Sequence, residues 1–200
     1  MNARTIAALS LTILFFAAGA WLLGRGEPAA ASTGDAASVP ELGMTRLERG
    51  KYLVTSVGCD DCHTPLKMGP NGPAPDMSRR LSGHPDSMKL PPAPPAAGPW
   101  MVSAAATLTA WSGPWGTSFT ANLTPDRETG LGSWTVQNFV QTIRKGRHMG
   151  SGRPLLPPMP AAFYANFSDD DLKAIFAYLQ SIPAIKNRVP QPLPPVASAQ

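Results

Sequence analysis

The sequence predicts an all-α domain that is interrupted by a long irregular segment and preceded by an N-terminal hydrophobic segment. Three observations indicate this fold. Two patterns of apolar residues with helical spacing stand near the ends of the globular part, around residues 44–58 and 168–182. The stretch 65–118 holds eleven prolines, which exclude a long helix because each proline lacks an N–H donor and fixes φ. A length of 200 residues matches one domain with appendages.

The first 31 residues have the pattern of an export segment. Arg4 precedes an uncharged run over residues 5–24, and small residues follow at 29–31. The run just reaches the length that crosses a bilayer, so residues 1–31 are either a cleaved signal peptide or an uncleaved membrane anchor. Both alternatives place the rest of the chain in the periplasm, anchored to the inner membrane or soluble after cleavage. Residues 32–43 are small and polar, which predicts a linker.

The globular domain is expected to cover residues 44–188. Its first helix places Leu47 and Val54 among charged residues, and Gly58 is expected to end it. The Pro-rich insert of residues 65–118 follows. It contains several large aromatic side chains whose apolar area favours an ordered, extended loop lying over a core rather than a disordered segment.

Two further helices are expected after the insert. Ser133 is a candidate N-cap for a helix whose apolar residues repeat at helical spacing as far as Ile143. The last helix is expected to begin at Ser168, because an aspartate three residues later completes an arrangement similar to a capping box. Pro183 is expected to end this helix. Residues 189–200 are rich in proline and predict a loose tail.

The charge of the chain is mildly basic, with a formal net charge of +4. No basic tract with interleaved aromatic residues is present in the sequence, which argues against nucleic-acid binding. A weakly acidic protein partner suits this charge better. Four basic residues form a candidate docking cluster, although a solvated helix face explains them equally well: Arg144, Lys145, Arg147 and Arg153.

The two cysteines of the chain, Cys59 and Cys62, lie in the sequence Cys-Asp-Asp-Cys-His. A disulfide between them would close a very small loop and constrain the unfolded chain little. A thioredoxin-like dithiol needs a strand before the motif and a helix after it, whereas here a helix precedes and prolines follow. A zinc site needs four ligands, and only His84 or His148 is available to complete a set with His63.

Cys-x-x-Cys-His is the attachment sequence of a c-type haem. On one helical turn the two sulfurs reach the two vinyl groups of the porphyrin, and the next residue directs its imidazole at the iron. Covalent attachment takes place outside the cytoplasm, which agrees with an export segment. We therefore expect one covalent haem c on Cys59 and Cys62, with His63 as the proximal iron ligand.

The second axial ligand of the iron has several candidates downstream of the motif. They are six methionines and two histidines, namely Met68, Met77, Met88, Met101, Met149, Met159, His84 and His148. Met159 is favoured because Pro158 and Pro160 fix the backbone on both sides of it. Met149 is the alternative, but glycines surround it and leave its backbone flexible. Most of the other methionines are expected to fill the core.

A short helix that leads into Cys-x-x-Cys-His, a proline-rich arm that bears Met159 and a last helix together resemble a class I cytochrome c domain. "NLTPDRETGLGSW", "GRPLLPPMP" and "SDDDLKAIFAYL" resemble more closely the cytochrome c subunits of periplasmic alcohol, aldehyde and gluconate dehydrogenases, over about residues 44–190. The resemblance implies a cytochrome c fold, axial ligands His63 and Met159, and positions for Asn122 and Trp134 near the haem propionates. Those subunits typically carry three haem motifs, whereas this chain carries one.

The function expected from this pattern is that of a periplasmic, membrane-tethered mono-haem cytochrome that carries single electrons between a redox donor and an acceptor. A membrane dehydrogenase or oxidase complex is an expected partner, and membrane contact is expected through the N-terminal segment. Two strong axial ligands leave no open position on the iron, so no catalytic residue is expected. The alternatives are a peroxidase-like haem enzyme that uses His84 or His148 as acid and base, or a gas sensor in which Met159 is displaced.

Overall fold

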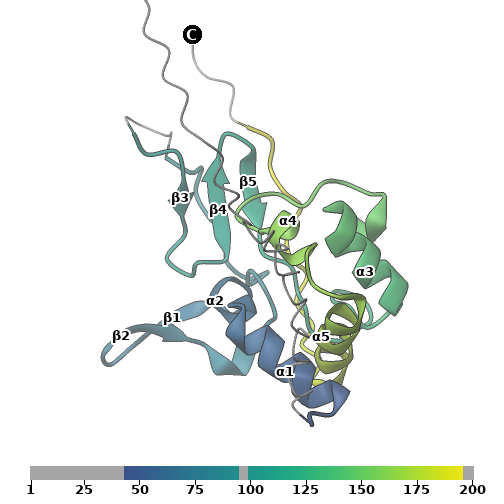
Figure 1. Cartoon of the computed structure of the whole chain (residues 1–200). Coiled ribbons are helices and arrows are strands. Elements are labelled where there is room, and N and C mark those ends of the chain that lie inside the picture. Colours follow the sequence, from purple (N-terminus) through teal and green to yellow (C-terminus); the bar gives the residue numbers. More distant parts are fainter. Residues whose placement is uncertain (1–42, 95–98, 196–200) are drawn as a thin grey trace, which may run out of the picture. The chain divides into compact units, whose positions relative to one another are not determined.

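The computed structural model describes residues 43–94 and 99–195, which contain helices and two small β-sheets (Figure 1). The predicted N-terminal segment 1–31 and nearly all of the linker lie outside the described residues. The helices are α1 (Arg46–Ser56), α2 (Cys59–His63), α3 (Val136–Lys145), α4 (Ala161–Tyr164) and α5 (Asp169–Ser181), and the strands are β1 (Leu66–Gly69), β2 (Gly72–Pro75), β3 (Ser103–Ala104), β4 (Ala110–Gly113) and β5 (Gly116–Phe119).

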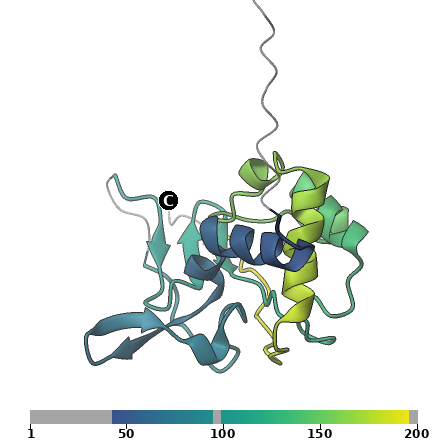
Figure 2. The same ribbon diagram turned by 60° about the horizontal axis from the view of Figure 1, so that its bottom comes forward.

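Helices α1 and α5 cross and make the most extensive contact between elements (Figure 2). Gly50 lies at the crossing, where a Cβ atom would come 2.0 Å from the carbonyl oxygen of Ala174, so only glycine allows this approach of the two backbones. Thr45 caps α1 in a capping box with Glu48. The predicted position of the first helix is therefore correct, although Leu47 points outward and is 48% exposed.

The core lies between α1, α3 and α5. Its buried side chains come from these helices and from two loops: Leu53, Val54, Leu81, Leu131, Phe139, Ile143, Leu172, Ile175, Phe176, Tyr178 and Leu179. Ser168 caps α5 as predicted, because its hydroxyl accepts a hydrogen bond from the Asp171 N–H at 3.0 Å. The N-cap of α3 is Thr135, two residues after the predicted Ser133, because Thr135 and Asn138 bond reciprocally.

The insert is the part in which the all-α expectation is wrong. It folds into a two-stranded antiparallel sheet, β1–β2, and a three-stranded antiparallel sheet in the order β3–β4–β5. Prolines are tolerated here because the strands are short and those that hold proline lie at an edge. The chain directly after the insert packs back on residues 81–84 of the insert, since the Leu123 N–H donates to the carbonyl of Leu81 and the His84 N–H donates to that of Thr120. The ordered extended segment expected over the core is thus a pair of sheets.

The chain after α5 runs back along the sheet that contains β5, as Figure 1 shows in yellow. Leu193 exchanges two backbone hydrogen bonds with Thr117, at 2.9 and 3.0 Å. The first residues of the expected loose tail are therefore held in place. Among residues 43–94 and 99–195, no helix has the length and apolar character that a membrane span requires.

Candidate haem-binding site

A cavity of about 480 Å³ lies between the helices and the insert. Its walls come from the α1–α2 junction, β5, the loop at 128–134, the arm at 148–160, α5 and the residues after it. This volume falls within the range of pockets that hold small molecules and cofactors. All six predicted site residues line it: Cys59, Cys62, His63, Met159, Asn122 and Trp134.

The two thiols are presented by α2, which begins directly after α1. Gly58 adopts a left-handed conformation at φ 75° and separates the two helices, so that the chain turns into the attachment segment. The cysteines are not joined in a disulfide. Burial raises the pKa of the Cys59 thiol to about 12, and the neighbouring Asp60 carboxylate adds to the effect. Burial also raises the pKa of Cys62.

His63 is buried and held from two sides. Its Nδ1 donates a hydrogen bond to the carbonyl of Ala121 at 2.7 Å, and its own carbonyl accepts from the N–H of Gly83 at 2.8 Å. Because Nδ1 carries the proton, Nε2 is the nitrogen with a free lone pair. Burial lowers the pKa of the ring, which favours the neutral imidazole that a metal requires. No sequence signal pointed to Ala121, since a backbone carbonyl is independent of side-chain type.

Met159 comes to the cavity on the arm between α3 and α4. It is partly buried and packs against the core. Its N–H donates to the carbonyl of Leu156 and its carbonyl accepts from the N–H of Ala161. The insert also holds this arm, because the Ser118 hydroxyl donates to the carbonyl of Pro157 at 2.5 Å. The arm is therefore fixed on both sides of Met159 and, through Ser118, from the insert.

The remaining candidate ligands lie elsewhere or have other contacts. Met149 is 39% exposed and does not line the cavity, and Met68 is 79% exposed. His84 is fully buried in the insert, where its Nδ1 lies 3.0 Å from the Thr109 hydroxyl. His148 does line the cavity. Within residues 43–94 and 99–195, no three His, Cys, Asp or Glu side chains are grouped as a site for a bare metal ion.

Asn122 and Trp134 both line the cavity but differ in how their polar groups are used. The Asn122 oxygen accepts from the N–H and hydroxyl of Thr124, and its amide donates to Thr129 and to the carbonyl of Ile185. Its amide is thus engaged within the chain. Trp134 packs edge-on against His148, with ring centroids 5.2 Å apart.

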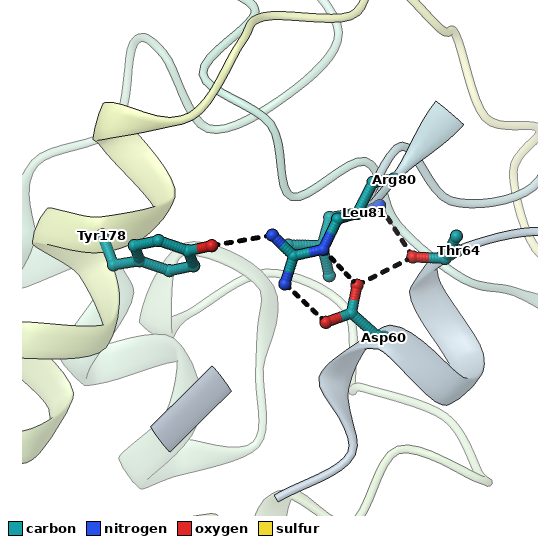
Figure 3. A network of polar contacts seen from close by, with 5 residues as sticks. All are labelled: Asp60, Thr64, Arg80, Leu81 and Tyr178. Carbon is teal, nitrogen blue, oxygen red and sulfur yellow. Dashed lines mark hydrogen bonds and ion pairs between the residues drawn. The ribbon is translucent and has the colours of Figure 1, made fainter. Parts of the chain in front are cut away.

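Helix α2, which carries both cysteines and is called the attachment helix below, is held against the rest of the domain by a polar network that could not be predicted from the sequence (Figure 3). We call this network the clamp. Arg80, from the insert, donates two hydrogen bonds to the Asp60 carboxylate at 2.6 and 2.8 Å and one to the Tyr178 hydroxyl of α5 at 2.7 Å. Thr64 joins the network by donating to Asp60 and accepting from the N–H of Leu81. Asp60 lies between the two cysteines, so this network fixes the orientation of α2.

The residues around the cavity fit a covalently bound haem. Two thiols three residues apart, a neutral imidazole with Nε2 available and a thioether surround one largely apolar space. This donor set is the one that holds the iron in His/Met cytochromes, where the thioether raises the reduction potential. The four side chains come from two segments about a hundred residues apart in sequence, and the fold brings them together.

Comparison with known proteins supports a c-type cytochrome role. No family model matches the chain. It is 36% identical over 80 residues to the cytochrome c subunit of the quinone alcohol dehydrogenase of Gluconobacter oxydans, which covers 38% of this chain and 16% of that protein. It is 30% identical over 132 residues to the gluconate 2-dehydrogenase cytochrome c subunit of Pantoea cypripedii. This alignment covers 66% of this chain and 22% of that protein. A diheme c-type cytochrome of Cereibacter sphaeroides is 26% identical over 186 residues. This alignment covers 92% of this chain and 49% of that protein.

The chain therefore spans less than half the length of each of these three relatives. All three are named as cytochromes, two of them as subunits of dehydrogenases and one as carrying two haems. Together with similarity to the cytochrome subunit of a fructose dehydrogenase, they support a c-type cytochrome that takes part in electron transfer.

Proposed function

We propose that this chain is a mono-haem c-type cytochrome that carries single electrons between protein partners. The observation that carries the proposal is the shared cavity, which collects Cys59, Cys62, His63 and Met159. Cys59 and Cys62 would form the thioether bonds, and His63 and Met159 would ligate the iron. One haem is proposed because the 200 residues contain a single attachment motif.

The chain's own residues account for a carrier rather than a catalyst. A bound haem supplies a one-electron couple. His63 is fixed by Ala121 and Gly83, so its ring has one orientation available. The arm that bears Met159 is held by Ser118, which favours a ligand that stays in place. The lining of the cavity is more apolar than polar, which would limit the water around a bound haem and so the rearrangement that accompanies each electron transfer.

We propose a dehydrogenase as the electron donor and a periplasmic location, tethered through residues 1–31 or free after their removal. The support is the similarity to proteins named as cytochrome subunits of gluconate, fructose and alcohol dehydrogenases. The export pattern of the N-terminal sequence supports the location.

Carbon monoxide binding to the reduced protein tests the proposal. The experiment compares visible spectra, before and after the gas is added, of the wild type, Met159→Ala and the control Met149→Ala. We expect the wild type and Met149→Ala to ignore the gas, because Met159 closes the sixth position, and Met159→Ala to bind it.

Two outcomes would contradict the proposal. If the purified wild type carries no covalent haem, the cytochrome assignment fails. If the wild type binds carbon monoxide readily, the sixth position is open or labile, the carrier assignment fails, and the haem enzyme or gas sensor takes its place.

A further inference from the structure

The three-stranded sheet brings three chain segments together at one of its ends. Ser103 of β3 pairs with Ser112 of β4, and Ser112 pairs with Thr117 of β5. Because neighbouring strands are antiparallel, the residues before β3 lie beside the turn that joins β4 and β5 (Figure 1). Leu193 pairs with Thr117 as well. We name the three segments that meet here, residues 99–102, 113–116 and 192–195, the sheet tip.

The second and third segments of the sheet tip are packed tightly against each other and on themselves. The ring of Trp115 lies over Gly113, where a Cβ atom would come 2.6 Å from it. Gly116 has a φ of 94°, and a Cβ atom there would lie 2.1 Å from the Leu193 carbonyl oxygen. These close approaches hold the turn and the end of the chain together, so this surface is formed before any partner arrives.

Every residue of the sheet tip is Gly, Pro, Trp, Met, Val or Leu, so it carries no charged side chain. Trp100, Met101 and Val102 are 77%, 62% and 43% exposed, and Leu193 is 55% exposed. Single exposed apolar side chains are ordinary on a protein surface. A group of them gathered from separate segments indicates a surface that contacts another molecule or a membrane.

The sheet tip has few hydrogen-bond donors to offer a protein partner. Five of its residues are prolines, which lack a backbone N–H: Pro99, Pro114, Pro192, Pro194 and Pro195. The N–H of Leu193 already donates to the carbonyl of Thr117. A peptide that adds a strand to a sheet needs free backbone donors and acceptors. A lipid layer needs only apolar area, and it penalises each unpaired donor.

The parts of the chain around the sheet tip also suit the surface of a membrane. Ser103, Ser112 and Thr117 are register partners across the three strands, so a row of hydroxyl residues stands directly behind the apolar end. Residues 87–125 contain no acidic residue and a single basic one, Lys89. Residues 172–200 contain no acidic residue either. An anionic bilayer would therefore meet no negative charge from these two stretches.

We propose that the sheet tip inserts into the surface of a lipid bilayer and holds the cytochrome domain in one orientation on the membrane. The inference rests on the proposed location next to the inner membrane. Tryptophan prefers the boundary between headgroups and acyl chains, where its ring is in an apolar layer and its N–H can still find a partner. Surfaces of this kind enter that boundary by about 5–10 Å and do not cross it.

The consequence for the proposed function is orientation. A single N-terminal anchor tethers a domain through a linker and leaves it free to turn, whereas a second contact removes that freedom. If residues 1–31 are cleaved, the sheet tip is instead a weak and reversible attachment, because one small apolar contact does not hold a protein on a bilayer permanently.

The test places one fluorescent label on the sheet tip of the full-length haem protein. The haem occupies Cys59 and Cys62 in the proposed function, so Met101→Cys supplies the single free thiol for an environment-sensitive dye. Met77→Cys is the matched control, because Met77 is also 62% exposed but stands next to Asp76, outside the tip. Both proteins are mixed with vesicles of phosphatidylethanolamine and phosphatidylglycerol, with and without brominated acyl chains.

Vesicles are expected to shift the emission of the label at position 101 to shorter wavelength, and brominated chains are expected to quench it. The label at position 77 should keep the emission that it has in water. Trp100→Asp, made in the Met101→Cys protein, should abolish the shift and the quenching, because a carboxylate is costly in an apolar layer and is repelled by an anionic surface. Trp100 is exposed, so this variant should keep the melting temperature of its parent.

Haem content and the carbon monoxide response, measured on the same samples, report on the proposed function separately. If both are normal but vesicles leave the label at position 101 in water, or quench both labels alike, the inference is overturned while the proposed function stands. It is also overturned if Trp100→Asp changes nothing. Shielding of position 101 that appears without vesicles and grows with protein concentration would show that a second copy of the chain covers the tip, which excludes the bilayer as its partner.

Discussion

Replacing Arg80 by methionine tests the clamp on the attachment helix. The change keeps a long apolar stem but leaves the Asp60 carboxylate and the Tyr178 hydroxyl without their shared donor. The side chains of Arg80 and Asp60 are 24% and 26% exposed, which is between the surface and the interior. Surface pairs contribute up to about 1 kcal/mol, and breaking a buried pair costs about 3–5 kcal/mol. We expect Arg80→Met to lower the free energy of unfolding by about 2 kcal/mol.

Urea unfolding of the purified haem protein, followed by circular dichroism, measures this change as a lower midpoint at constant slope. In a domain of this size a loss of about 2 kcal/mol corresponds to roughly 4–8 °C in melting temperature. Arg46→Met is the matched control, because Arg46 is an exposed residue at the start of the neighbouring helix α1.

A double-mutant cycle separates the ion pair from other effects of the substitution. Asp60→Asn removes the charge on the other side, and the double variant with Arg80→Met should lose clearly less than the sum of the two single losses. The reasoning would be refuted by an Arg80→Met protein that unfolds within about 0.5 kcal/mol of Arg46→Met, or by a cycle that shows no coupling.

Two further perturbations address the crossing of α1 and α5. Gly50→Ala places a methyl group 2.0 Å from the Ala174 carbonyl oxygen and should destabilise the protein by about 2 kcal/mol or more, although alanine has the better helix propensity. The control Gly43→Ala, whose new methyl group has no atom within 4 Å, should leave the stability unchanged. Equal unfolding midpoints of the two variants would contradict the close approach. The Arg49 hydrogen bond holds the pKa of Asp171 below its ordinary value, so its stabilising contribution is present at neutral pH and is lost as the pH falls below about 4. The stability difference between wild type and Asp171→Asn should therefore shrink with acidification, and a pH-independent difference would exclude this pairing as its source.

Helices and caps could be predicted from the sequence because their signals are local. The apolar repeat and the Ser168 cap of α5 lie within a few residues of each other, and the structure has both. The Cys-x-x-Cys-His motif is likewise local, and it identified three residues that the cavity collects. The shift of the α3 cap from Ser133 to Thr135 shows the limit of such signals. Both residues can cap, and the Asn138 partner of Thr135 decides between them.

The sheets and the clamp could not be predicted because their partners are distant in sequence. Two of the four residues of strand β2 are prolines, which in a sequence argue against a strand. The strand is possible because it lies at the edge of a sheet, and the sequence does not show that position. Arg80 bonds Asp60 across 20 residues and Tyr178 across 98, and no spacing rule connects them. Leu193 stands in a proline-rich ending that resembles a tail, and Asn187 stands just before it; the hydrogen bonds that hold both residues have partners far away in sequence.

The insert therefore does more than cover the core, because Gly83 within it and Ala121 just after it both bond the proposed proximal ligand. The chain leaves the site after His63, forms both sheets, and returns to place the Ala121 carbonyl on Nδ1 of the same histidine, 58 residues later. Gly83, within the insert, holds the His63 carbonyl through its N–H. Since the donor strength of a ligating histidine depends on the hydrogen bond at its second nitrogen, the packing of the insert sets the electronic character of His63. A segment that looks like an elaboration in sequence thus helps to hold the proposed ligand in place.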